Sequence, residues 1–209
     1  MKEMTEYWDE RSAIFDDMIE KVYKQTHIDT IDSVNHYLKP TDNVLDFACG
    51  TCIISAGMAG HVAKVRAIDI SEKMVELGRT RIEKLGIGNV ELSQCGLFDE
   101  SLEPGSFDAV VAANVLCYLE HWDREMERIR SLLKPGGLFL SATDCLGQQI
   151  TGEGVRKFIK MHTGKMPYEA FFRMKGLEKK IAGSGFTILE SKNLHPAPPN
   201  LFVAARKNG

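Results

Sequence analysis

Two carboxylates and a glycine near the start of this 209-residue chain have the chemistry and the spacing to hold a nucleoside. Asp46 and Gly50 lie in Val44–Cys52, where a short apolar run passes into small residues. Asp69 ends the next apolar run, Val65–Ile68. Glycine lets a ligand lie against the backbone, and a carboxylate about 20 residues further on can accept hydrogen bonds from ribose hydroxyls. This pairing predicts a nucleoside site on an open α/β sheet.

Alternating strands and helices are expected to position these residues. Ser71 is the expected N-cap of the helix that follows Asp69. Lys134–Gly137 is expected to stop a helix and form a turn. The alternation predicts a parallel sheet with helices on both faces. The expected strands are Val44–Phe47, Val65–Asp69, Val90–Ser93, Phe107–Ala113 and Leu138–Ala142, and the expected helices are Ile53–Ala59, Ser71–Leu85 and Trp122–Leu133.

Both ends of the chain depart from this alternation. Tyr7–Tyr23 predicts an amphipathic helix, and Ile28–Leu38 predicts a second helix that stops before Pro40. Two late strands without a helix between them predict an antiparallel finish to the sheet. The expected apolar face of the first helix is Ile14, Met18, Ile19 and Val22. The expected C-terminal part begins with a mixed, partly helical insert at Gln148–Arg173 and a helix at Lys175–Ala182 that stops at Gly183. Strands at Phe186–Glu190 and Leu201–Ala205 follow, joined by Asn193–Asn200.

Composition limits the classes of function. The net charge is −3 without a long basic run, so we expect neither a nucleic-acid nor an anionic-membrane partner. No apolar run is long enough to span a bilayer. Met1–Asp17 lacks the apolar segment of a signal peptide, and the five cysteines form no disulfide pattern. A cytoplasmic protein is therefore expected.

Several motifs in order carry a family resemblance. Asp46–Cys52 and Asp69 are followed by Ser106-Phe107-Asp108 with Asn114-Val115-Leu116, then Leu132–Gly137, then Gly185-Phe186. Together they resemble the class I S-adenosylmethionine-dependent methyltransferases. The resemblance covers most of residues 40–145 and, more weakly, 175–206. It implies a Rossmann-like, doubly wound, seven-stranded sheet, mostly parallel with an antiparallel C-terminal strand, plus N-terminal helices.

The resemblance also implies one domain with four parts and a cofactor. The parts are a helical cap at 1–39, a cofactor-binding core at 40–145, a lid or substrate insert at 146–174, and a helix with a strand pair at 175–209. The implied cofactor is S-adenosylmethionine, its product S-adenosylhomocysteine, and the implied partner a small-molecule methyl acceptor. The implied cofactor-binding residues are Tyr7, Arg11, Asp46, Ala48, Cys49, Gly50, Asp69, Ile70, Met74, Gly96, Leu97, Asn114 and Val115.

Individual roles follow from residue chemistry and the resemblance. Asp69 is expected to receive both ribose hydroxyls, and Ile70 and Met74 to pack on the adenine. Tyr7, Trp8 and Arg11 are implied to fold over the cofactor, with Arg11 near its carboxylate; packing is the alternative. Asp69 could instead only cap the helix at Ser71.

The chain departs from the family pattern at three positions. Ala48 and Cys52 replace glycines, and Gly96 replaces an acidic residue near the adenine, where the N–H of Leu97 could serve. Alanine fits at position 48 where the backbone angle is ordinary. These departures motivate a rival hypothesis, a non-catalytic module that binds the cofactor and acts through a partner. A nicotinamide-dependent oxidoreductase is disfavoured because G-x-G-x-x-G is absent.

No catalytic residue is identified by type and spacing. Methyl transfer mainly needs positioning and exclusion of water, so Tyr118, His121 and Asp144 are only candidate proton acceptors. Asn114 is not followed by the Pro-Pro-aromatic signature of amide or nucleobase methylation. Acceptor specificity is expected from Tyr7–Arg11 and Gln148–Arg173. Within the latter, Lys157–Lys165 is expected to be a solvated face, and Met161, Met166, Tyr168, Phe171 and Phe172 to form either a lid or ordinary packing.

The cysteines allow two sharper alternatives. Cys49 and Cys52 form a C-x-x-C, but a zinc site needs further ligands and no second close pair exists, so we expect no metal. Cys95, Cys117 and Cys145 each follow an expected strand, which could place all five thiols around one pocket. A thiophilic substrate such as an arsenic species is then the alternative to small-residue packing.

Overall fold

The computed structural model describes residues 3–209, apart from the side chain of Glu153. The first two residues of the expected helical cap lie outside the described residues. Among the described helices, none is long and apolar enough to cross a membrane.

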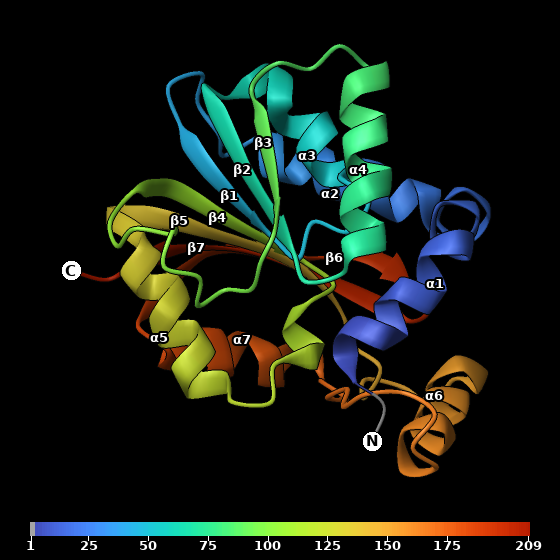
Figure 1. The fold of residues 1–209 in the computed structure, drawn as a ribbon. Helices are drawn as coiled ribbons and strands as arrows, with labels where there is room; N and C mark the ends of the chain where they lie inside the picture. The colour runs from blue at the N-terminus through green and yellow to red at the C-terminus, as the bar shows by residue number, and fades with distance from the viewer. Residues whose placement is uncertain (1–2) are drawn as a thin grey trace.

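A seven-stranded sheet in the order β3-β2-β1-β4-β5-β7-β6 forms the centre of the fold (Figure 1). The strands β1 to β5 run parallel, β7 is antiparallel to β5, and β6 is antiparallel to β7. This confirms the predicted doubly wound sheet with an antiparallel finish. The strands are β1 (Asn43–Phe47), β2 (Lys64–Asp69), β3 (Val90–Gln94), β4 (Phe107–Ala113), β5 (Leu133–Asp144), β6 (Phe186–Pro196) and β7 (Pro199–Lys207).

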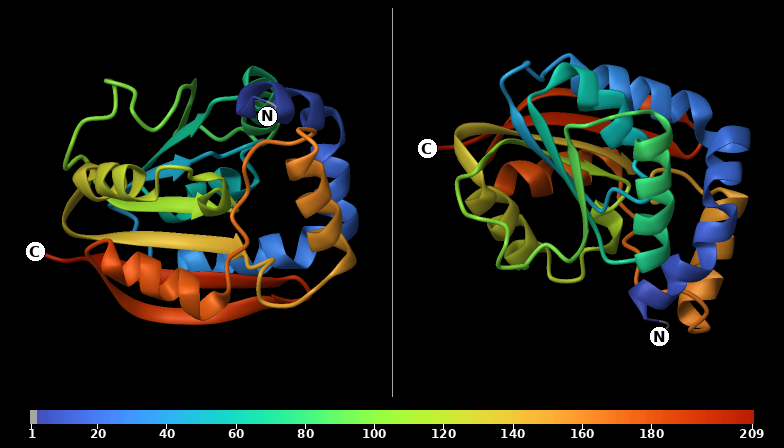
Figure 2. Two further views of the ribbon diagram at one scale, coloured as in Figure 1. Left: turned by 90° about the horizontal axis from the view of Figure 1, so that it is seen from below. Right: turned by 45° about the horizontal axis from the view of Figure 1, so that its top comes forward.

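Helices cover both faces of the sheet. One face carries α2 (Lys24–Asn35), α3 (Ile53–Met58) and α4 (Glu72–Lys84), and the other carries α5 (Trp122–Leu132) and α7 (Met174–Gly183) (Figure 2). Because both faces are covered, the central strands are continuous apolar runs. In β4, Val110 and Ala112 face the α5 side, whereas Ala109 and Val111 face the other. The short 3₁₀ turns are η2 (Ala59–His61) and η3 (Leu116–Tyr118).

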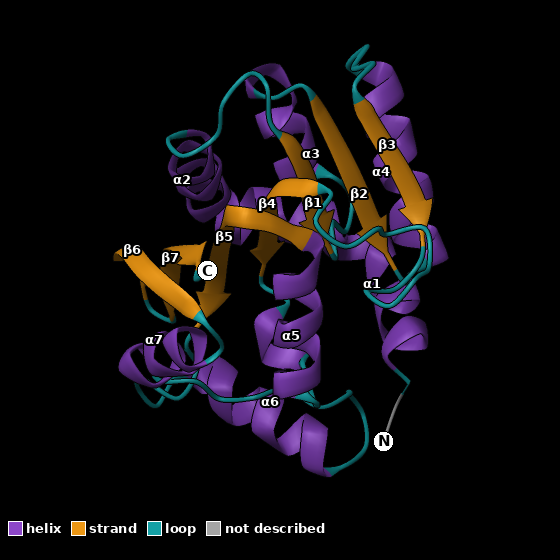
Figure 3. Cartoon of the chain, turned by 90° about the vertical axis from the view of Figure 1, so that its left-hand side faces the viewer, coloured by secondary structure: helices purple, strands orange, loops and turns teal. Residues whose placement is uncertain are grey.

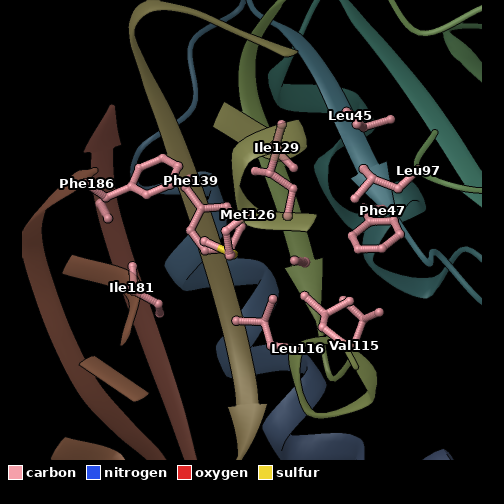
Figure 4. Close-up of a cluster of buried hydrophobic side chains, with 14 of the residues drawn as sticks. Leu45, Phe47, Leu97, Val115, Leu116, Met126, Ile129, Phe139, Ile181 and Phe186 are labelled. Atoms are coloured by element: carbon pink, nitrogen blue, oxygen red, sulfur yellow. The ribbon is translucent and has the colours of Figure 1, made fainter. Parts of the chain in front are cut away.

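The core on the α5 side is the larger of the two buried clusters. Met126 and Ile129 of α5 and Ile181 of α7 pack on Phe139 and its neighbours in the sheet (Figure 4). All four of these side chains are fully buried. Fully burying such a side chain stabilises the fold by roughly 1.5–3 kcal/mol, so this packing fixes the sheet edge that carries the site.

The N-terminal segment is one helical run rather than the two predicted helices. It consists of α1 (Met4–Met18), the π-helical turn η1 (Ile19–Tyr23) and α2, and it bends between α1 and α2 (Figure 2). The predicted apolar face is wrong at Ile14 and Val22, which are 56% and 60% exposed. Ile14 precedes the π-helical turn and Val22 lies within it. The inward face of α1 is set by its hydrogen bonds and ion pair with Ser71 and Arg81.

Two predicted turns lie inside strands. Helix α5 ends at Leu132, one residue before the expected end, and Lys134–Gly137 belongs to β5, where the pairing with β4 shifts and Gly136 has φ +71°. A bulge therefore replaces the expected separate turn. Similarly, β6 and β7 extend through most of Asn193–Asn200 and leave only a short connection around Ala197 and Pro198. Helix α7 ends at Gly183 as predicted.

Candidate cofactor and acceptor site

The site lies where the strand order reverses, between β1 and β4. Open α/β sheets bind ligands at such a point, beyond the carboxyl ends of the strands. The turn after β1 and Asn114 after β4 occupy this place. Figure 3 shows β1 and β4 side by side at the centre of the sheet.

Backbone strain concentrates at this edge of the sheet. Ala48, Cys52 and Asn114 have φ between +52° and +60°, and they are the only non-glycine residues with positive φ among residues 3–209. Alanine is expected to fit at position 48 with an ordinary, negative φ. The structure instead gives Ala48 a φ of +58°. Such angles cost about 1–3 kcal/mol each, and they concentrate at ligand sites. Gly50 has φ +54° and an added Cβ would meet only Phe15, at 3.8 Å, so the turn leaves room for a close ligand.

Asp69 joins the β1 turn to the start of α4. Its two carboxylate oxygens accept the N–H groups of Gly50 and Ser71, each at 2.9 Å. Burial raises the pKa of Asp69, and these two hydrogen bonds partly offset that effect. The predicted N-cap is confirmed, since Ser71 Oγ accepts the N–H of Met74 at 3.2 Å. Capping is thus done by Ser71 itself, and the carboxylate of Asp69, with about four acceptor positions, retains capacity for a further donor.

Asp46 is a buried acid beside the same turn. Its side chain is 1% exposed, and Ser55 Oγ donates to Oδ2 at 2.5 Å. Burial raises the pKa of Asp46 to about 7; the hydrogen bond from Ser55 opposes this shift and the charge of Asp69 adds to it. Asp46 is therefore partly protonated near neutral pH.

A cavity of about 410 Å³ opens over Asp69 and the apolar residues beyond it. One end presents the Asp69 carboxylate, and the rest is mainly aliphatic and aromatic. A ribose against the carboxylate and a purine between the apolar walls fit these residues, so the site suits the adenosyl part of S-adenosylmethionine. The predicted residues on its walls are Ala48, Gly50, Asp69, Ile70, Met74, Leu97, Asn114, Val115, Tyr118 and His121; Met4, Trp8, Phe15, Phe47, Ile68, Cys95, Phe98, Ala113, Leu119, Glu120 and Glu125 complete them.

A smaller cavity of about 130 Å³ adjoins the first beneath α1. It gathers the remaining predicted residues except Gly96, which lines neither cavity. The two cavities share walls at Trp8, Phe15 and Tyr118 as well as at the β1 turn. The predicted residues on the walls of the smaller cavity are Tyr7, Arg11, Asp46, Ala48, Cys49, Gly50, Asn114, Tyr118 and Asp144; the others are Trp8, Phe15, Met18, Ile19, Tyr23, His27, Thr51, Ile53, Ile54, Ala113 and Lys157.

Helix α1 is fastened over both cavities by its acidic residues. Asp9 accepts the hydroxyl of Ser71 at 2.5 Å, at the N-terminus of α4. Asp16 accepts Arg81 Nη2 and Thr51 Oγ1, each at 2.7 Å. These contacts turn the aromatic side of α1 inward. Its inward residue Trp8 meets Tyr118 edge-on at 5.5 Å and Phe15 at 6.2 Å between ring centroids.

An aromatic residue on α1 is the main omission from the predicted site. The prediction places Trp8 with Tyr7 and Arg11 over the cofactor but does not include Phe15. Phe15 lies seven residues after Trp8, so the two side chains share one face of the helix. This spacing is the sequence signal that could have added Phe15 to the predicted site. Arg11 has no carboxylate partner within the described part of the chain: its guanidinium lies 5.2 Å from the ring centroid of Tyr7 and donates to Met18 Sδ at 3.7 Å.

The expectation of a solvated face at Lys157–Lys165 is wrong for Lys157. Helix α6 (Gly152–His162) directs this side chain inward to a 2.8 Å ion pair with Glu169, and their side chains are 19% and 1% exposed. Lys160, His162 and Lys165 are exposed as expected. Of the expected lid residues, Met166 is buried and Phe172 packs edge-on against Trp122.

The five cysteines do not form one ring around a pocket. Cys49 lines the smaller cavity and Cys95 the larger, whereas Cys52, Cys117 and Cys145 are buried and line neither cavity. Cys49 and Cys52 have their sulfurs 3.6 Å apart, and burial raises the pKa of Cys49 well above its usual value. No group of three or more metal-ligating side chains occurs among the residues that the structure describes.

Comparisons with known proteins agree with this geometry. A model of the methyltransferase domain family matches residues 44–137. Residues 44–137 are therefore similar to a methyltransferase domain. The match begins at the first residue of the predicted β1 strand and ends at Gly137, so it spans both sides of the strand-order reversal. The resemblance to class I S-adenosylmethionine-dependent methyltransferases is confirmed.

The relatives share the domain but differ in length and in title. A demethylmenaquinone methyltransferase of Bacillus cereus is 36% identical over 107 residues, which cover 48% of this chain and 44% of the relative. The chain thus spans less than half the length of this curated relative. A Thermotoga maritima structure described as a possible histamine N-methyltransferase covers 99% of this chain and 100% of its own, with a TM-score of 0.74 at 15% identity. A Haloferax volcanii methyltransferase solved with the activator Trm112 covers 97% of this chain and 98% of its own, with a TM-score of 0.76 at 14% identity. At these identities the two structures establish the fold.

Proposed function

We propose that this protein transfers a methyl group from S-adenosylmethionine to a small-molecule acceptor. The observation that carries the proposal is the Asp69 carboxylate. It is bound to the N–H of Gly50 on the wall of a 410 Å³ cavity. In this proposal the larger cavity holds the adenosyl group, and Asn114 and the β1 turn lie beside the methionine part. Arg11 lies next to the methionine carboxylate.

When bound, the cofactor supplies an activated methyl group on a sulfonium. The chain then needs to orient the acceptor and exclude water. Helix α1 serves both needs, because it lines the smaller cavity and places Trp8 against Tyr118. Tyr118 is partly buried, and desolvation raises its pKa well above the usual value, so it serves as a hydrogen-bond donor rather than as a base at neutral pH.

Turnover separates this proposal from a non-catalytic binding module. Incubation with S-adenosylmethionine and a fraction of small molecules should form S-adenosylhomocysteine in excess over the protein, as measured by chromatography. The same mixture without the fraction should form almost none. Tight cofactor binding with no product above one equivalent from any acceptor fraction would favour the binding module.

A further inference from the structure

The ion pair between Lys157 and Glu169 lies at the smaller cavity and has no role yet. Lys157 Nζ is 2.8 Å from Glu169 Oε1, and Tyr118 Oη donates to the same oxygen at 3.4 Å. Both Lys157 and Tyr118 line the cavity. A buried charge is costly unless it is paired. Removing Lys157 and Glu169 from water therefore costs free energy that their mutual attraction offsets.

The pair is incompletely satisfied for a purely structural role. Glu169 Oε2 is buried and has no hydrogen-bond partner among the described residues. A carboxylate has about four acceptor positions, and buried polar atoms in folded proteins are almost always bonded. The ammonium of Lys157 has three N–H donors, of which Glu169 takes one. Lys157, which lines the cavity, therefore retains N–H donors for a ligand that accepts hydrogen bonds.

Charge and shape narrow the class of ligand. Burial alone would lower the pKa of Lys157, but the charge of Glu169 and its hydrogen bond raise it above the usual value. Lys157 thus presents a cation to the cavity, as Arg11 does, and the acids on the same walls are Asp46 and Asp144. The two cations disfavour a protonated amine beside them. Trp8, Phe15 and Tyr118 supply aromatic walls, which suit a planar body.

We propose, on the basis of the methyl transfer proposed above, that the acceptor is a small phenol or enol whose oxygen binds the ammonium of Lys157. Glu169 is the positioning residue that holds Lys157 at the cavity. Asp144 lines the same cavity and takes the proton of the hydroxyl. The acceptor oxygen forms the new O–CH₃ bond as the S–CH₃ bond breaks, the sulfonium becomes a neutral thioether, and the proton passes from Asp144 to solvent.

The test uses 4-nitrophenol as the probe and the full chain saturated with S-adenosylhomocysteine. An opposite charge within about 4–6 Å lowers the pKa of an acid by about 1–3. Bound 4-nitrophenol should therefore ionise at a pH that is lower by about 1 or more, which is read from nitrophenolate absorbance. This spectroscopic change reports the cation at the oxygen and does not depend on turnover.

Variants distinguish the cation from the fold. Lys157→Met with Glu169→Gln removes both charges together, which avoids an unpaired buried carboxylate, and it should abolish the change in ionisation. Lys157→Arg should retain part of it, and Lys160→Met, an exposed cation on the same helix, should retain all of it. Every variant is measured at saturating S-adenosylhomocysteine, because Lys157 lines the smaller cavity together with Arg11.

Three results would overturn the inference. The first is unaltered ionisation of 4-nitrophenol on the wild-type protein saturated with S-adenosylhomocysteine, and the second is a double variant that behaves as the wild type does. Either would leave the proposed methyl transfer intact. The third is failure of S-adenosylhomocysteine to bind at all, which would contradict methyl transfer and, with it, this acceptor class.

Discussion

The Asp46→Asn variant is expected to unfold at a higher denaturant concentration than the wild-type protein at pH 8. The pKa of Asp46 rises from 3.8 to about 7 on folding, chiefly through burial. A pKa difference of one between two states corresponds to about 1.36 kcal/mol, so ionising Asp46 in the folded state costs on the order of 4 kcal/mol. Asparagine has no charge to bury and can still accept the hydroxyl of Ser55.

The sign of the pH dependence follows from this raised pKa. Because the folded-state pKa lies above the unfolded-state value, the stability is fully present below about pH 4 and is lost as the pH rises through about 7. Urea unfolding at pH 4 and pH 8 should show a smaller loss for Asp46→Asn than for wild type. Asp108 provides the opposite control: the N–H of Asn43 and the ammonium of Lys134 outweigh burial and lower its pKa, so Asp108→Asn should destabilise the protein at pH 8. A wild-type protein more stable than Asp46→Asn at pH 8 would contradict the burial argument.

Replacing Asp69 by asparagine is expected to weaken binding of S-adenosylhomocysteine by about 100-fold. Hydrogen bonds to a charged group contribute roughly 1.5–3 kcal/mol each, and about 1.4 kcal/mol changes affinity tenfold. Asparagine keeps the side-chain volume and one acceptor oxygen, so most of the link between Gly50 and Ser71 should persist. Titration calorimetry measures the loss directly.

Asp42 supplies the matched control for Asp69. It is also a buried acid, 9% exposed, and it accepts a backbone N–H from Lys39 at 2.9 Å. It precedes β1, at the end of the sheet opposite the cavities. Asp42→Asn should lower stability and leave the affinity unchanged. Equal affinities for wild type and Asp69→Asn would reduce Asp69 to a link between the β1 turn and α4.

The sheet and the β1 turn could be predicted because their signals are local. Phe107–Ala113 is a continuous apolar run whose bounds agree with β4, and Ser71 is a cap whose hydrogen bond lies three residues away. Small residues at positions 48–52 indicate the turn. The strain at Ala48 could not be predicted from residue size, since its backbone angle depends on the β1–β4 edge around it.

The inward face of α1 and the Lys157–Glu169 pair could not be predicted in the same way. Ile14 and Val22 fit a helical stripe, but ion pairs and hydrogen bonds from α1 to Arg81 and Ser71 orient the helix differently. Those partners lie more than 60 residues away. Lys157 belongs to a basic segment typical of a solvated face, and only the return of the chain to Glu169 buries it. Contacts distant in sequence decide both features.

Comparative binding of S-adenosylhomocysteine and NAD tests the central claim most directly. We expect S-adenosylhomocysteine to bind at one site and, at about 100 times its dissociation constant, to stabilise the fold by roughly 2.7 kcal/mol. NAD should have no effect, because G-x-G-x-x-G is absent from the turn after β1. Titration calorimetry that detects no binding of S-adenosylhomocysteine at millimolar concentration would contradict the proposed cofactor site.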